Sequence, residues 1–329
     1  MKNVLITGVN GQDGSLMADY LLKVTDYNIY GVIRKNSNMT NKINDKRFKL
    51  LEVDQFNKDI IDKIFLEIKP DYCINFASQN FYNDVWGNPS QTFEINAMLV
   101  LWLLDAIRNF MFKCKFIGMG SAEEFGDILY SPQDLKHPCN PKSPYSIGKY
   151  AARNLIDMYR ERYNIYAIHC VLYNHEGTRR NERFITRKIT KGLSKIKSDL
   201  MNNIDFEPIK VGNINIRKDW SDAEDFIEAI WLMLNQDKSR NYLLSSDETH
   251  SIKEFIDLAC KYADINVEWK DDRLYSNDKI IVEIDKNLYR PIENYLLVGD
   301  SSETRKILNW QPKTSFEMLV KKMIDFDIK

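Results

Sequence analysis

The sequence has few cysteines and few histidines, and both are scattered. Cys73, Cys114, Cys139, Cys170 and Cys260 are odd in number and form no C-x-x-C pair. This pattern argues against a disulfide framework and against a structural zinc site. The four histidines show no metal-ligand spacing either, so we expect no metal site. Free thiols are typical of a reducing compartment, and we expect a cytoplasmic protein.

Long hydrophobic runs and a strong net charge are also lacking. The most apolar stretch, "AMLVLWLLDAI", is interrupted by Asp105 far short of a membrane span, and the apolar run in "MKNVLITG" is too short for a signal peptide. With a net charge of −1 and a pI near 6.5, we expect neither nucleic acid nor a membrane as partner. The 44% of hydrophobic residues suffice for a sizeable core.

Short apolar runs alternate with helical patterns in the first half of the chain. The runs are nearly continuous, which is typical of strands buried on both faces of a parallel sheet. We expect strands at 3–7, 28–33, 48–53, 72–77, 114–119 and 166–173. We expect helices at about 14–24, 57–68, 90–109 and 145–162. The alternation predicts a doubly wound α/β fold with a parallel sheet and helices on both faces.

The rhythm changes after residue 173, where a basic helical stretch precedes shorter and less regular segments. We expect a smaller, mixed α/β C-terminal domain that binds substrate. Residues 1–173 and roughly 219–247 would form the cofactor-binding domain. Roughly 174–218 and 248–329 would form the second domain.

Gly8, Gly11 and Gly14 lie between the first expected strand and the first expected helix. Glycines allow a tight turn and let backbone amides approach a pyrophosphate, which then faces the positive end of the helix. The alternative is a plain turn, but the strand–turn–helix context favours a dinucleotide site in a Rossmann-type domain. The G-x-x-G-x-x-G spacing resembles that of extended short-chain dehydrogenase/reductases.

The second expected strand ends in Arg34 and Lys35, followed by Asn36 and Ser37. An NAD site usually has a carboxylate there, whereas two cations suit the 2′-phosphate of NADP. A solvated basic turn is the alternative. Asp54, at the end of the third strand, is placed to accept the adenine amino group.

Tyr145 and Lys149 are one helical turn apart at the start of an expected helix, and Ser121 follows the fifth strand. We expect the three to converge, with the ammonium group lowering the phenol's pKa so that the phenol exchanges a proton during hydride transfer. Tyr275 and Lys279 repeat the spacing without a preceding serine or a helix start. We interpret that second pair as surface residues.

Glu123 indicates more than simple hydride transfer. Oxidation of a hexose at carbon 4 makes the carbon 5 proton acidic, so that a base can remove it while the carbon 6 hydroxyl leaves. Glu123 and not Glu124 is favoured as this base because residues two apart on extended backbone share a face, here with Ser121. A solvated acidic loop is the alternative.

Longer motifs resemble the GDP-mannose 4,6-dehydratase family. They include "TGVNGQDGSLMADYLL", "SPYSIGK" and "YNHEGTRRNERFITRKIT", and the likeness continues through "VGNINIRKDWSDAEDFIEAIWLML" to "IDKNLYRPIENYLLVGDSSETRKILNWQP". The resemblance implies an NADP-dependent lyase that acts on GDP-mannose or a close GDP-sugar, such as a GDP-heptose or GDP-hexosamine. It also implies a homo-oligomer, either a dimer or a tetramer.

By this resemblance Asn174 contacts the sugar or its diphosphate, Lys188 and Arg290 hold the diphosphate, and Glu293 binds ribose. The family's Lys-Arg order is inverted at Arg217 and Lys218, which moves the expected ligand contact to Lys218 because neighbours on a strand point to opposite faces. Cofactor contacts are expected from Gly8, Asn10, Gly11, Gln12, Asp13, Gly14, Arg34, Lys35, Asn36, Ser37, Asp54, Gln55, Ala77, Ser78, Gln79, Tyr145, Lys149, His175 and Arg180. Substrate contacts are expected from Gln79, Asn80, Ser121, Glu123, Asn174, Lys188, Val211, Arg217, Lys218, Arg290 and Glu293.

Two alternatives to a dehydratase remain. One is a GDP-sugar 4-epimerase or 4-reductase, which Glu123 argues against because neither reaction needs a base at carbon 5. The other is a non-catalytic NADP-binding regulator, which the retained Tyr145–Lys149 pair argues against.

Overall fold

The computed structural model describes residues 1–35, 37, 39–289 and 296–328. A parallel seven-stranded sheet forms the centre of its first part, called the first half below, to which the later strand β11 also belongs. Its strand order is β11-β6-β5-β4-β1-β2-β3. The strands β2 and β3 are added on one side of β1 and the strands from β4 onward on the other side, as in a doubly wound sheet. The strands are β1 (Asn3–Thr7), β2 (Asn28–Arg34), β3 (Phe48–Val53), β4 (Tyr72–Asn75), β5 (Lys115–Met119), β6 (Ala167–Leu172) and β11 (Tyr242–Leu244). The fold expected from the sequence is confirmed.

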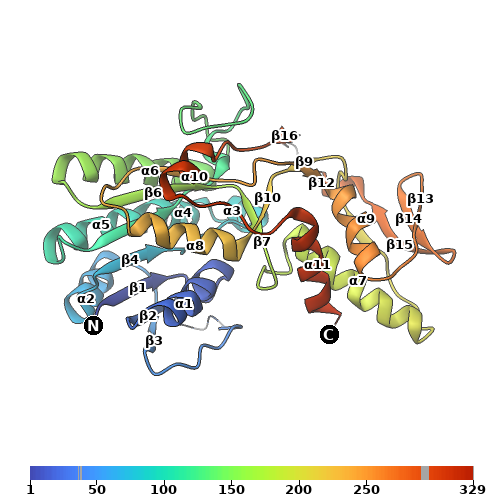
Figure 1. Cartoon of the computed structure of the whole chain (residues 1–329), viewed down its shortest axis with the longest axis horizontal. Coiled ribbons are helices and arrows are strands. Elements are labelled where there is room, and N and C mark those ends of the chain that lie inside the picture. The colour runs from blue at the N-terminus through green and yellow to red at the C-terminus, as the bar shows by residue number, and fades with distance from the viewer. Residues whose placement is uncertain (36, 38, 290–295, 329) are drawn as a thin grey trace.

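Helices cover both faces of this sheet because alternate side chains of each strand are buried on opposite sides (Figure 1). Val4 and Ile6 pack on one side with residues of α1 (Gln12–Val24) and α8 (Ala223–Leu234). Leu5 packs on the other side with residues of α2 (Lys58–Ile68), α5 (Leu99–Phe110) and α6 (Pro144–Tyr163). Polar groups of the strands can therefore reach ligands only where the strands end.

The helix expected at 90–109 is interrupted. It consists of α4 (Pro89–Phe93), a π-helical segment η1 (Glu94–Met98) and α5, and a further short helix, α3 (Tyr82–Gly87), precedes it. The extra residue of a π turn shifts the helix register locally, and such turns are frequent at functional sites. Here it brings the buried side chain of Asn96 toward the loop after β4.

The second half forms three small sheets around its own buried cluster. β7 (Asn174–Glu176) pairs with β10 (Trp220–Asp222), and β9 (Arg217–Lys218) lies between β12 (His250–Ser251) and β16 (Leu296–Leu297). The third sheet contains β8 (Ile209–Val211), β13 (Glu268–Lys270), β14 (Arg273–Ser276) and β15 (Lys279–Ile284). The remaining elements are η2 (Ala122–Glu124), α7 (Ile185–Met201), α9 (Ile252–Tyr262), η3 (Lys286–Leu288), α10 (Ser302–Leu308) and α11 (Phe316–Asp327).

The chain crosses between the two halves more than once. After β10 it returns to the large sheet as α8 and β11, as the sequence indicated. It returns again near its end, because Leu308 and Trp310 are buried in the same cluster as Val4. The division into two domains stays a prediction, and 302–310 pack with the first of them. Among the helices of the described residues, none is long and apolar enough to cross a membrane.

Asp219 connects three segments at the junction of the two halves. Its carboxylate, at 0% exposure, accepts hydrogen bonds from Ser246 (N and Oγ, both 2.7 Å), Asp247 (N, 3.1 Å) and Gly299 (N, 3.4 Å). Burial raises the pKa of Asp219 to about 7, although the bonds from Ser246 and Gly299 lower it. The folded protein therefore holds a proton at this site that the unfolded chain releases.

Asp219 should make the protein less stable as pH rises. Between the unfolded value of 3.8 and about 7 the folded state binds more protons, so the free energy of unfolding falls through this window by a few kcal/mol. The free energy of unfolding, measured with urea at pH 5 and at pH 8, should fall by more between these pH values in the wild type than in Asp219→Asn. Asp205→Asn, at an exposed carboxylate, should lose as much free energy of unfolding between pH 5 and pH 8 as the wild type. An equal loss in all three proteins would contradict the assignment.

Candidate functional site

The glycine turn after β1 has the geometry that a dinucleotide phosphate needs. Gly8 has φ +70°, and a Cβ there would lie 2.7 Å from the backbone nitrogen of Ala77. A Cβ on Gly14 would lie 2.4 Å from the carbonyl oxygen of Gly8. Gly11 is the N-cap of α1 and has no side chain to occupy the helix N-terminus. Backbone amides of the turn can therefore approach an anion closely.

Asp13, in the first turn of α1, is tied to the second half of the chain. His175 Nε2 lies 2.9 Å from Asp13 Oδ2, and Gln12 donates to Asp13 Oδ1 at 3.0 Å and to the carbonyl oxygen of His175 at 3.1 Å. Burial raises the pKa of Asp13, but His175, Gln12 and Arg180 together lower it to about 2. Burial lowers the pKa of His175, but Asp13 and the bond to the Tyr173 carbonyl oxygen together raise it above its ordinary value. The first helix is thereby fixed to β7, and Oε1 of Gln12 is buried with no hydrogen-bond partner among the described residues.

The residues expected to select the cofactor's ribose lie at the ends of β2 and β3. Arg34 is exposed at the last position of β2, and Ser37 donates its N–H to the carbonyl oxygen of Arg34 at 3.1 Å. Lys35 Nζ lies 2.8 Å from Asp54 Oδ1, so these two expected contacts are paired with each other. Asn36 lies outside the described residues. Gln55 is exposed next to Asp54.

The loop after β4 carries Ala77, Ser78 and Gln79, and a residue that the sequence reasoning missed holds it. Asn96 donates to the carbonyl oxygen of Gln79 at 3.1 Å and accepts from Ser78 Oγ at 2.8 Å. Its own position depends on the π turn described above. The available signal was a single amide side chain inside the apolar run "FEINAMLVLWLL".

The turn after β5 presents Glu123 and hides Glu124, as the sequence predicted, but for a different reason. Only Ser121 is extended; Ala122–Glu124 form one 3₁₀ turn, so alternation along a strand does not apply. Ser121 is the N-cap and accepts from the Glu123 N–H at 3.2 Å. Glu124 folds back to accept from the Ser121 N–H at 2.8 Å and is 0% exposed. Glu123 is exposed, close enough to Tyr145 to raise its pKa.

Tyr145 and Lys149 occupy one face of α6, with Lys149 Nζ 5.8 Å from the centre of the Tyr145 ring. The expectation that Lys149 lowers the phenol's pKa is wrong for this structure. Burial raises the pKa of Tyr145, Glu123 raises it further, and a hydrogen bond from Ser121 only partly offsets these effects. Lys149 is 4% exposed and donates to the Met119 carbonyl oxygen at 2.7 Å. Burial lowers the pKa of Lys149 to about 8, while Glu124 and Asp13 raise it.

The other Tyr-x-x-x-Lys sequence has no such geometry. Tyr275 belongs to β14 and Lys279 to β15, which are the two strands of one hairpin. Asn277 and Asp278 make its turn, both with positive φ. The two side chains therefore do not lie one turn apart on a helix, and the interpretation of this pair as surface residues agrees with the fold.

The expected substrate residues lie on different elements of the second half. Asn174 is on β7 and donates to the Asp219 carbonyl oxygen at 3.4 Å. Lys188 is on α7, exposed, and donates to the Lys210 carbonyl oxygen at 2.6 Å. Neighbouring groups desolvate it and lower its pKa. Val211 is 1% exposed in the core of the second half, so only its backbone is available. Arg290 and Glu293 lie outside the described residues.

Arg217 and Lys218 are the two residues of β9, and Arg217 is bonded to neighbouring elements. Arg217 donates to Glu254 Oε1 at 2.7 Å and to the carbonyl oxygen of Thr249 at 2.5 Å. These bonds fix Arg217 to the start of α9, and the substrate roles of Arg217 and Lys218 stay predictions.

The edge of the expected sugar site joins the two halves. Asn80 is exposed, and next to it the Phe81 ring packs 4.8 Å from the Phe184 ring, which lies just before α7. Arg183 donates to both carboxylate oxygens of Asp84 at 2.9 and 3.0 Å. The Arg180 guanidinium lies 3.5 Å from the centre of the Phe184 ring. Arg180 also acts electrostatically on Asp13 and Tyr145, so this side chain connects the Phe184 contact with the first turn of α1 and the start of α6.

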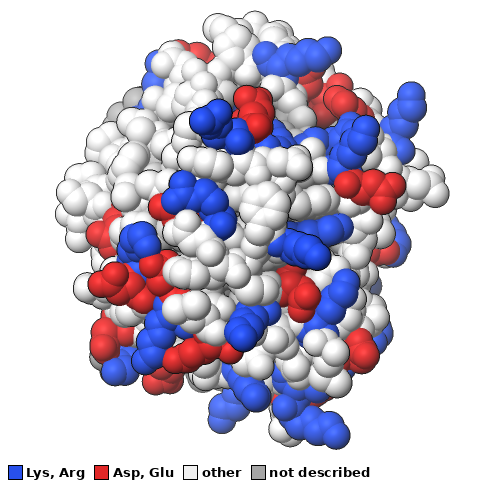
Figure 2. Space-filling model, turned by 90° about the vertical axis from the view of Figure 1, so that its left-hand side faces the viewer, with Lys and Arg blue, Asp and Glu red and all other residues white. Residues whose placement is uncertain are grey.

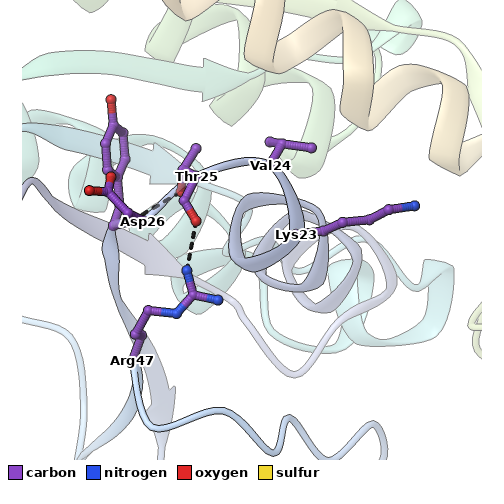
Figure 3. Close-up of a pocket in the computed structure, with 6 residues that line it drawn as sticks. Lys23, Val24, Thr25, Asp26 and Arg47 are labelled. Atoms are coloured by element: carbon purple, nitrogen blue, oxygen red, sulfur yellow. Dashed lines mark hydrogen bonds between the residues drawn. The ribbon is translucent and has the colours of Figure 1, made fainter.

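Two open hollows of the described surface are lined by other residues. One of about 470 Å³ is lined by Lys23, Val24, Thr25, Asp26, Tyr27 and Arg47. Arg47 donates to the Thr25 carbonyl oxygen at 2.6 Å and caps the end of α1 (Figure 3). That end is opposite the glycine turn, about 20 Å away along a 13-residue helix. The face of the molecule in Figure 2 carries interspersed charges of both signs, in keeping with the small net charge.

Known proteins resemble this chain along nearly all of its length. The family model for GDP-mannose 4,6 dehydratase matches residues 5–323. GDP-mannose 4,6 dehydratase 1 of Arabidopsis thaliana is 38% identical over all of this chain and 90% of the relative, and GDP-mannose 4,6-dehydratase of Vibrio cholerae O1 is 32% identical over all of this chain and 94% of the relative.

Solved structures share the fold at lower identity. UDP-glucose 4-epimerase of Thermotoga maritima superposes with a TM-score of 0.81 at 18% identity, covering 98% of both chains. dTDP-glucose 4,6-dehydratase of Bacillus anthracis gives 0.80 at 16% identity, covering 99% of this chain and 96% of the other. On the full-length sequence match, the chain belongs to the GDP-mannose 4,6-dehydratase family.

Proposed function

We propose that the protein is an NADP-dependent GDP-sugar 4,6-dehydratase, which converts GDP-mannose or a close GDP-sugar to the GDP-4-keto-6-deoxy sugar. The observation that carries the proposal is the arrangement at the ends of β5 and α6. Ser121, Glu123 and Tyr145 interact with one another there, while the neighbouring Glu124 is turned into the protein. A hydroxyl, a phenol and a carboxylate directed to one place are what oxidation followed by elimination requires.

The residues at the carboxyl edge of the sheet fit a dinucleotide. A Cβ on Gly8 or Gly14 would fill the space of the turn, and the first turn of α1 is open to an anion. Gln12 Oε1, buried without a partner among the described residues, offers an acceptor beside that turn. When bound, the nicotinamide would supply the acceptor for a hydride from carbon 4 and the donor of a hydride to carbon 6. Arg34 and Lys35 favour NADP over NAD because their positive charges suit a 2′-phosphate.

Tyr145 would exchange the proton of the carbon 4 hydroxyl, with the Ser121 hydroxyl donating to the phenolic oxygen. Lys149, buried and bonded to the Met119 carbonyl, contributes a fixed positive charge near pH 7. Glu123 would remove the carbon 5 proton, and that proton leaves with the carbon 6 hydroxyl as water. Lys188 and Lys218 would pair with the diphosphate, whose negative charge needs cations in a partly closed site.

We also infer a cytoplasmic homo-oligomer. All five cysteines are free, which suits a reducing compartment. Ile147 and Met158 lie on one face of α6 and are 46% and 50% exposed. Apolar side chains exposed along a helix support contact with a second subunit.

Glu123→Gln should abolish dehydration while leaving cofactor binding intact. Loss of the base should lower kcat by about 10²-fold or more. Purified protein would be incubated with GDP-mannose and other GDP-sugars, and product masses recorded. Loss of one water without net cofactor consumption is expected for the wild type. Asp127→Asn, at an exposed carboxylate on the same loop, is the control and should stay active.

The same assay separates the other reactions of this fold. A gain of two hydrogens would identify a reductase, and a product of unchanged mass would identify an epimerase; either result, or full dehydration by Glu123→Gln, would falsify the assignment. Turnover of none of the GDP-sugars, with NADPH still bound, would point to a binding protein.

Gly14→Ala should weaken NADPH binding by at least about tenfold, because its Cβ would collide with the Gly8 carbonyl oxygen and displace the turn. Binding would be measured by fluorescence titration, with thermal unfolding recorded in parallel. Gly87→Ala has no heavy atom within 4 Å of the new Cβ and serves as the matched control. Unchanged affinity in a folded Gly14→Ala protein would remove this turn from the cofactor site.

Arg34→Ala should weaken NADP⁺ binding by roughly 10- to 100-fold and leave NAD⁺ binding nearly unchanged, because one charge-assisted bond to the 2′-phosphate is lost. Dissociation constants for both cofactors decide this. Lys46→Ala, at an exposed cation before the start of β3 and away from Arg34, should change neither. A similar loss for both cofactors would show that Arg34 does not read the 2′-position.

A further inference from the structure

The turn that carries Ser121 and Glu123 rests on a buried pair of ionisable side chains, Glu124 and His169. Both are 0% exposed, and His169 Nε2 lies 3.0 and 3.1 Å from the two Glu124 oxygens. Glu124 Oε1 also accepts from the Ser121 N–H at 2.8 Å. The carboxylate therefore bridges the catalytic turn to β6.

The chain makes room for this pair at Gly120. A Cβ there would lie 2.2 Å from His169 Nε2 and 2.5 Å from Glu124 Oε1. An apolar residue at position 124 could fill the same interior volume without a buried partner, and replacing two buried polar partners together by apolar residues of similar shape is often nearly neutral for stability. Packing alone therefore does not explain why Gly120, Glu124 and His169 occur together.

The hydrogen bonds indicate where the charge of the pair resides. His169 Nδ1 is buried with no hydrogen-bond partner among the described residues. A neutral imidazole that donates from Nε2 leaves only a lone pair at Nδ1, whereas an imidazolium would bury an unbonded N–H. The pair then carries one net negative charge, on Glu124.

That charge faces the catalytic residues of α6, which packs against the turn. It acts on Lys149, raising its pKa against the effect of burial, and on Tyr145. Asp13 on α1 also acts on Lys149. The thiols of Cys139 and Cys170 face Glu124 as well, and burial, with Glu124, raises the pKa of both.

We propose that Glu124 and His169 form a positioning pair behind the catalytic turn, which fixes the Ser121 backbone so that Glu123 is presented to the substrate, and which directs a buried negative charge toward Lys149. Neither residue contacts the substrate. The proposal rests on the proposed function for its catalytic consequence, but its effect on Lys149 exists without substrate.

The test uses Glu124→Gln, which keeps the shape of the side chain and removes its charge. In protein labelled with [ε-¹³C]lysine, the NMR titration of Lys149 should move down from about 8 by roughly 0.5 to 1 pH unit. The alkaline limb of the pH profile of kcat should move to lower pH by a similar amount, and KM for the GDP-sugar should stay constant. Asp127→Asn should leave the titration unchanged. An unchanged titration in Glu124→Gln would overturn the electrostatic role.

A second variant separates positioning from stability. Glu124→Leu with His169→Leu removes both buried polar groups together, so the fold should survive better than with either change alone. We expect kcat to fall at least tenfold at unchanged KM, although thermal unfolding stays near that of the wild type. If this double variant keeps the wild-type kcat and the wild-type pH profile, the pair has only a structural role. If the wild type dehydrates no GDP-sugar, the proposed function is contradicted instead. The NMR titration of Lys149 would still test the electrostatic effect of Glu124 in that case.

Discussion

Strands buried on both faces can present polar chemistry only where they end, and this constraint locates the whole site. The apolar side chains of β1, β4, β5 and β6 fill the two cores on either side of the sheet. The glycine turn, the loop after β4 and the Ser121 turn all follow the carboxyl ends of such strands. In a parallel sheet these ends meet at one edge. A cofactor and a sugar nucleotide can therefore meet there although their expected contacts are spread over most of the chain.

Several ionisable groups at this edge, among them Lys149, Asp13 and His175, are withdrawn from water, so each of these needs a partner in the protein. Lys149 is bonded to the Met119 carbonyl, and Asp13 to His175. Their protonation then depends on one another, because Asp13 acts on both His175 and Lys149. The raised pKa of Tyr145 follows from the same burial. A neutral phenol is thus the resting form, and a positive charge brought by the bound cofactor would favour its ionisation.

Much of the architecture could be predicted because the strands of a buried parallel sheet are continuously apolar; β1 and β3 match their expected bounds. The different orientations of Glu123 and Glu124 were predicted for a wrong reason, since a capping interaction between Ser121 and Glu124, and not strand alternation, decides which carboxylate is buried. The role of Glu123 as a base stays a prediction. The π turn at Asn96 and the direction of the Tyr145 pKa shift could not be predicted. Both depend on residues distant in sequence and on the degree of burial, which local patterns do not encode.

The contacts that join the two halves differ in strength from one end of this edge to the other. The Asp84–Arg183 pair is 41% and 50% exposed, and an exposed ion pair contributes about 0–1 kcal/mol. The Phe81–Phe184 contact adds about as much. By contrast Asp13–His175, which joins the same two halves next to the glycine turn, is largely buried and costly to break. The two halves are therefore joined more firmly beside the glycine turn, through the buried Asp13–His175 pair, than at the exposed contacts of Phe81 and Asp84.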